Sequence, residues 1–123
     1  MKKRPVYLNL FAMRFPVTAI ASILHRVSGV LVFLVIPGML WVLNQSLVSE
    51  AQFKHIQSGL HSHAFKLLVW LVLSGLAYHL FAGVRHLLMD MGVGESWSKA
   101  KFSAYGTLLL TVASVILIGV WLW

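Results

Sequence analysis

Four residues that could carry chemistry lie on one side of an apolar stretch that ends near residue 90. They are His79, Gly83, His86 and Asp90. At about 100° per residue, these positions fall within about 60° of one another on a helix. A neutral imidazole inside a membrane helix is a suitable axial ligand for haem iron, and it is equally typical of a hydrogen bond between helices. The pattern alone leaves both interpretations open.

The two histidines of this face lie at different depths. His79 is 11 residues from Asp90, which is about 16 Å along a helix, and His86 is about 10 Å nearer the charged end. Because an Fe–N bond is only about 2 Å long, the two cannot easily bind one iron from the same face. The outer-loop histidines lie on the wrong side, and His25 lies near the inner interface beside a cation, so a second imidazole would have to come from another chain. His86 and Arg85 are then suited to the haem propionates.

A second polar group precedes the first apolar run and contains Ser22, His25 and Arg26. Ser22 and Arg26 are four residues apart and share a helix face. A hydroxyl beside a guanidinium can hold a quinone oxygen and stabilise negative charge on it. The alternative is an arginine that binds lipid phosphate and a serine bonded to its own helix. Asp90 is a candidate proton donor to a reduced quinone, or a solvated residue.

Three long apolar runs must position these residues, at about residues 27–43, 64–89 and 105–123. A helix needs about 20 apolar residues to cross a bilayer, and backbone groups in lipid must bond within the segment. We therefore predict an all-α integral membrane protein, with three transmembrane helices at about residues 18–44, 64–90 and 103–123 in a single domain, residues 1–123. Pro37 and Gly38 favour a kink in the first helix.

The composition excludes several other classes. The chain is 59% apolar and 11% charged, against about 45–50% and 25% in soluble domains. It has no Cys, which excludes disulfides, iron–sulfur clusters and thioether-attached haem. The net charge of +7 does not indicate nucleic-acid binding, because the basic residues flank the apolar runs.

The distribution of basic residues predicts an orientation. Eight of the ten Lys and Arg residues precede the first run, lie near the end of the second, as Arg85 does, or lie between the second and third. This distribution places the N-terminus in the cytoplasm and the C-terminus in the periplasm. The N-terminal segment up to Phe15 is expected to be an uncleaved surface segment, because Arg14 and Pro16 interrupt any signal sequence. His55, His61 and His63 fall in the outer loop, which we interpret as solvated rather than metal-binding.

Two segments resemble a known family. One reads Ser-x-x-His-Arg-x-Ser-Gly from Ser22, and the other reads His-x-x-x-Gly-x-Arg-His-x-x-x-Asp from His79. Together they resemble the cytochrome b membrane-anchor subunit of bacterial succinate dehydrogenase, respiratory complex II, and the resemblance covers nearly the whole chain. It implies an inner-membrane subunit, not catalytic alone, that anchors the catalytic subunits and helps pass electrons from succinate oxidation to ubiquinone.

The resemblance also implies cofactors, partners and residue roles. A haem b would be shared with a second small anchor subunit that supplies the other axial ligand, and an iron–sulfur subunit and a flavoprotein subunit would dock on the cytoplasmic side. The implied roles are axial haem ligation by His79, a propionate region at His25, Arg26 and His86, a quinone site at Ser22 and Arg26, and proton donation by Asp90. The rival interpretations are a haem-free quinone-reactive anchor of a fumarate-reductase-like complex and a small pore-forming membrane protein.

Overall fold

The computed structural model describes residues 14–59 and 61–123, and this part of the chain is helical with no strand. The helices are α1 (Val17–Val48), α2 (Glu50–Gly59), α3 (His63–Asp90) and α4 (Trp97–Leu122). Three of them, α1, α3 and α4, are long and apolar enough to cross a membrane. The prediction of an all-α membrane protein with three spans is confirmed. The predicted uncleaved surface segment up to Phe15 lies mostly outside the described residues.

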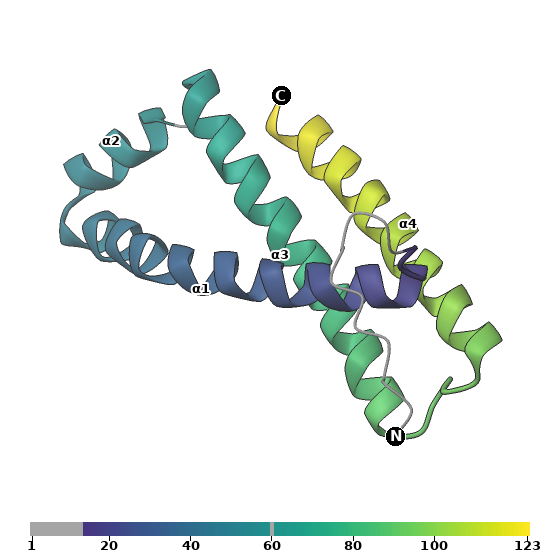
Figure 1. Ribbon diagram of the computed structural model, residues 1–123. Coiled ribbons are helices and arrows are strands. Elements are labelled where there is room, and N and C mark those ends of the chain that lie inside the picture. The colour runs from purple at the N-terminus through teal and green to yellow at the C-terminus, as the bar shows by residue number, and fades with distance from the viewer. Residues whose placement is uncertain (1–13, 60) are drawn as a thin grey trace.

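The helices are arranged as an antiparallel pair crossed by a third (Figure 1). α3 and α4 lie side by side, while α1 crosses α3 and diverges from it towards α2 (Figure 1). The N-terminal half of α1 therefore meets the C-terminal half of α3. This crossing brings together the two polar groups that the sequence places on separate helices.

Helix boundaries follow local chemistry. α1 begins directly after Pro16, which is extended, and it continues unbroken through Pro37. The Ser62 hydroxyl accepts a hydrogen bond from the Phe65 amide at 3.2 Å and caps α3. After α3, Gly92 and Gly94 adopt φ of 81° and 82°, which glycine reaches without the steric cost of a Cβ atom. These glycines reverse the chain into α4.

The segment between the first two spans contains a helix that the sequence analysis did not predict. Residues 44–63 were interpreted as a loop, and α2 occupies half of them. The Ser49 hydroxyl accepts from the Gln52 amide at 3.2 Å, and Lys54 pairs with Glu50 at 2.6 Å. Ser-x-x-Gln is a helix-start pattern, and a Glu–Lys pair four apart supports a helix. Both signals were present in the sequence.

Small side chains form the contacts between the spans. The buried apolar residues of the described part include four alanines, which let helices approach closely. Most large apolar side chains are exposed, as expected where a protein faces lipid or further subunits instead of water. The buried alanines are Ala21, Ala82, Ala100 and Ala104.

Three polar side chains tie the helices together through backbone carbonyls. The Tyr78 hydroxyl donates to the carbonyl of Ala21 at 2.8 Å, joining α3 to α1. The Trp70 indole donates to the carbonyl of Val115 at 2.9 Å. These bonds fix the register of α3 against both neighbours. At the far end, the Lys66 ammonium donates to the carbonyl of Leu122 at 2.6 Å.

The side chain of Arg85 is buried against α4 and points away from that of its sequence neighbour His86. Its Nε donates to the Ser103 hydroxyl at 3.0 Å and its Nη2 to the carbonyl of Ala100 at 3.1 Å, and only 6% of the residue is exposed. The structure therefore separates the side chain of Arg85 from that of His86, with which it was expected to face the haem propionates. Adjacent helix residues point about 100° apart, so Arg85 reaches α4 while His86 reaches α1.

Arg85→Met should weaken the packing of α4 on α3. The substitution removes two hydrogen bonds from a charged donor, so we expect unfolding to become easier by about 1.5–3 kcal/mol. Denaturant unfolding of the protein in detergent, followed by circular dichroism, measures this change. Lys101→Met, which removes an exposed charge from α4, is the control. Equal stability of the two variants would contradict the role of Arg85.

Candidate functional site

Three imidazole rings stack where α1 crosses α3. His25 of α1 lies 4.4 Å from His79, measured between ring centroids, with the planes 18° apart. It lies 4.7 Å from His86, with the planes 21° apart. His79 and His86 are seven residues, about two turns, apart on α3, which leaves a slot for one flat ring. The imidazole of His25 fills that slot.

Two glycines make the close approach possible. A Cβ atom on Gly83 would lie 3.3 Å from His25 Nε2, and one on Gly29 would lie 3.0 Å from His79 Cε1. The absence of a Cβ atom on Gly83 leaves room for the ring of His25. On α1, the absence of a Cβ atom on Gly29 lets the ring of His79 lie against that helix.

The hydrogen bonds of His79 differ between its two ring nitrogens. Nδ1 lies 3.1 Å from the Ser28 hydroxyl oxygen and 3.3 Å from the carbonyl oxygen of His25. Ser28 donates its own hydroxyl hydrogen to that carbonyl at 2.8 Å. Within residues 14–59 and 61–123, Nε2 makes no hydrogen bond. The ring is half-buried, and its Nδ1 is held against α1 by Ser28 and the carbonyl of His25.

Ser22 and His86, which are 64 residues apart in sequence, are in contact. His86 Nδ1 lies 2.7 Å from the carbonyl oxygen of Ala82, and Nε2 lies 3.3 Å from the Ser22 hydroxyl oxygen. Since a carbonyl oxygen only accepts, the hydrogen between His86 and Ala82 lies on Nδ1. Arg26 is exposed one turn after Ser22 on α1. Asp90 is exposed at the end of α3.

The stack does not form a conventional metal site. Among the described residues, no three His, Asp or Glu side chains converge to hold a metal ion. Stacked rings present their faces to one another, whereas metal ligands point their nitrogens at one point. The outer histidines His55, His61 and His63 are all exposed. Nothing in the described part of the chain joins them to the stack.

Ser28 is a site residue to which the sequence analysis assigned no role. It belongs to the motif that begins at Ser22, and it lies three residues after His25 on the same side of α1. A serine one turn from a histidine can bond back to its own helix or reach a neighbour. The sequence signal was present, but only the crossing of α1 and α3 shows that Ser28 reaches His79.

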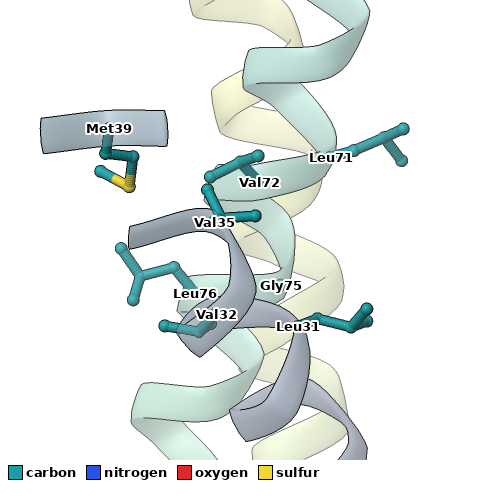
Figure 2. Close-up of a pocket in the computed structure, with 8 residues that line it drawn as sticks. All are labelled: Leu31, Val32, Val35, Met39, Leu71, Val72, Gly75 and Leu76. Atoms are coloured by element: carbon teal, nitrogen blue, oxygen red, sulfur yellow. The ribbon is translucent and has the colours of Figure 1, made fainter. Parts of the chain in front are cut away.

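An apolar crevice opens beside the stack where α1 and α3 diverge. Figure 2 shows the side chains that line it, from both helices and without a polar group. The cavity measures about 200 Å³. It begins about one helix turn from the contact between Gly29 and His79. The lining residues are Leu31, Val32, Val35, Met39, Leu71, Val72, Gly75 and Leu76.

Fold and site together define an integral membrane protein of three long helices with a histidine cluster at a helix crossing, a class in which intramembrane polar residues mark a functional site. The sequence profile of the succinate dehydrogenase/fumarate reductase transmembrane subunit family matches residues 1–118. The chain belongs to this family.

Individual relatives agree with this assignment. The chain is 44% identical over 122 residues to the succinate dehydrogenase cytochrome b556 subunit of Coxiella burnetii, covering 98% of each chain. It is 31% identical over 121 residues to the corresponding subunit of Paracoccus denitrificans, covering 92% of this chain and 90% of the relative. It is also similar to the mitochondrial cytochrome b560 subunit of Dictyostelium discoideum, at 30% identity over 92% of this chain and 58% of the relative. The expected family is therefore confirmed.

Proposed function

We propose that this chain is the haem b-containing membrane anchor of a succinate:ubiquinone oxidoreductase. It would attach an iron–sulfur subunit and a flavoprotein subunit to the bacterial inner membrane and help form the site of ubiquinone reduction. The family and the cytochrome names of its relatives support this proposal. The chain itself is a non-catalytic subunit, and succinate oxidation belongs to other chains.

The observation that carries the proposal is the arrangement of His79. Its Nδ1 is held at 3.1 Å by Ser28, and its Nε2 makes no hydrogen bond in the described part of the chain. A histidine ligand is characteristically held in this way, with one nitrogen bound by a second residue and the other on the metal. His79 Nε2 therefore fits axial ligation of haem iron. When bound there, haem b supplies a one-electron store near the quinone.

The second axial ligand would come from a partner anchor subunit. Two imidazoles that held one iron would each have to direct a ring nitrogen at it. His25 instead lies face to face with His79, at 4.4 Å and 18°, and cannot oppose it from that position. His25, Arg26 and His86 lie on the cytoplasmic side of His79 in the proposed orientation. These three residues would form the propionate region of the haem.

The proposed quinone site consists of Ser22 and Arg26. Ser22 is half-buried beside His86, while Arg26 is exposed one turn further along α1. A hydroxyl donor and a permanent positive charge fixed near one point stabilise negative charge that develops on a quinone oxygen. Asp90, exposed at the end of α3, would deliver protons from the cytoplasm. This orientation places the N-terminus in the cytoplasm and the C-terminus in the periplasm.

A reduced-minus-oxidised absorbance spectrum of the purified complex tests the haem. We expect a b-type band, and its absence would favour a haem-free anchor of a fumarate-reductase-like complex. Co-purification of a flavin-containing subunit tests the assembly. A chain that purified without such a subunit would favour the small pore-forming protein instead.

Gly29→Ala should reduce the haem content of the complex. The added Cβ would lie 3.0 Å from His79 Cε1, so the imidazole must move away from α1. Gly75→Ala is a matched control, because its Cβ would meet nothing within 4 Å and alanine favours a helix by about 1 kcal/mol. The haem-to-flavin ratio measures the effect. Equal ratios in the two variants would show that contact with α1 does not position His79.

A further inference from the structure

We propose that Ser28 is a positioning residue that fixes the tautomer of His79 and so presents Nε2 for ligation. This inference rests on the proposed haem ligation by His79 and deepens it. It concerns a side chain that lies on α1, whereas the ligand lies on α3. Ser28 touches neither the metal nor the quinone in this role, and it acts only through His79.

The hydrogen positions follow from which groups can donate. The carbonyl oxygen of His25 only accepts, and it receives the single hydroxyl hydrogen of Ser28 at 2.8 Å. The Ser28 oxygen is then left as an acceptor for His79 Nδ1 at 3.1 Å, with the same carbonyl 3.3 Å from that nitrogen. Both neighbours of Nδ1 thus accept, so Nδ1 carries the hydrogen. In a neutral imidazole, Nε2 then holds the lone pair.

The surroundings make this arrangement rigid. Ser28 is 7% exposed, so water does not compete well for its hydroxyl. Its bond to the carbonyl three residues earlier holds the oxygen at one position on α1. The neighbouring bond from Tyr78 to the carbonyl of Ala21 ties the two helices together close to the same crossing. The acceptor for His79 is therefore built into the helix crossing.

This hydrogen bond should change the electronic character of the ligand as well as its orientation. An imidazole that donates from Nδ1 to an acceptor is a more basic ligand. A more basic ligand favours the ferric over the ferrous state and lowers the midpoint potential of the haem. Loss of the Ser28 oxygen leaves only the longer contact to the His25 carbonyl. We therefore expect Ser28→Ala to have a higher midpoint potential and about tenfold weaker haem retention. Loss of a residue that holds a metal ligand typically weakens metal binding by about 10- to 100-fold.

The experiment is Ser28→Ala in the purified complex, with three measurements. They are the haem-to-flavin ratio, the midpoint potential from a redox titration, and the low-spin ferric EPR signal. Ser74→Ala is the matched control, because the Ser74 hydroxyl is buried without a hydrogen-bond partner in the described residues. We expect Ser28→Ala to raise the potential and shift the EPR signal, and Ser74→Ala to keep wild-type values. Wild-type potential and EPR signal in Ser28→Ala would overturn the inference.

A second pair of variants separates the hydroxyl from packing. Threonine at position 28 keeps an oxygen that can bond to the same helix carbonyl, while valine has nearly the same shape without it. We expect Ser28→Thr to have a lower haem potential than Ser28→Val. This comparison holds even where Ser28→Ala fails to assemble. Equal potentials in the Thr and Val variants would overturn the inference.

The measurements also separate this inference from the proposed function. Haem that persists in His79→Ala would overturn the ligand assignment and with it the role of Ser28. Haem that is lost in His79→Ala, together with wild-type potentials in the Ser28 variants, would overturn only the positioning role. A raised haem potential in Ser28→Ala that is absent from Ser28→Thr and from Ser74→Ala would support both the ligand assignment and the positioning role.

Discussion

Complexes that carry His79→Ala are expected to contain at least tenfold less haem than the wild type. The imidazole is the proposed ligand of the iron, and alanine offers none. Its Nδ1 bonds to Ser28 and to the carbonyl of His25 contribute modestly to helix packing, so some assembly should persist. The haem-to-flavin ratio of the purified complex measures the loss directly.

A matched control for this variant is His55→Ala. His55 lies on α2 and is exposed, so we expect the haem content of that variant to equal the wild type. Haem content in His79→Ala equal to that of the control would refute the ligand assignment. Haem lost equally from both variants would show that the complex tolerates no histidine change, and it would contradict the specific role of His79.

Arg26→Leu should lower ubiquinone reduction far more than reduction of a soluble dye. A hydrogen bond from a charged donor contributes about 1.5–3 kcal/mol, which corresponds to a loss of about ten- to a hundredfold in quinone reduction. Ser22→Ala should have a smaller effect, about three- to tenfold, because a neutral hydroxyl contributes less. Both activities are measured on one preparation with succinate as electron donor. The ratio of ubiquinone reduction to dye reduction is the quantity compared between variants.

The control for this prediction removes a charge on the same side of the membrane. Arg14 is exposed just before α1, so Arg14→Leu should leave the ratio of quinone to dye reduction at the wild-type value. Equal loss of both activities in Arg26→Leu would argue that Arg26 supports assembly instead. Selective loss of quinone reduction, matched in direction by Ser22→Ala, would support the quinone site.

Local features of the sequence predicted the spans and the polar faces. Long apolar runs require helices in lipid, and the structure contains three such helices. Helical periodicity also predicted that His79 and His86 share a face of α3. The polar helix α2 was missed because its start signal, Ser49 with Gln52, lies in a segment without a hydrophobic pattern.

Contacts between helices could not be predicted in the same way. Periodicity shows that Arg85 and His86 point in different directions, but it does not show which helix each one meets. The structure places Arg85 against Ser103 of α4 and His86 against Ser22 of α1. Residues adjacent in sequence can therefore contact different helices.

The sequence by itself determined the three membrane helices, the family and the residues on each polar face, because these depend on composition, periodicity and motif spacing within one segment. Only the tertiary structure decided that His25 stacks between His79 and His86 and that Ser28 holds His79. Those contacts join residues more than 50 positions apart. They depend on where small residues let α1 cross α3, and that is a property of two packed surfaces rather than of either helix alone.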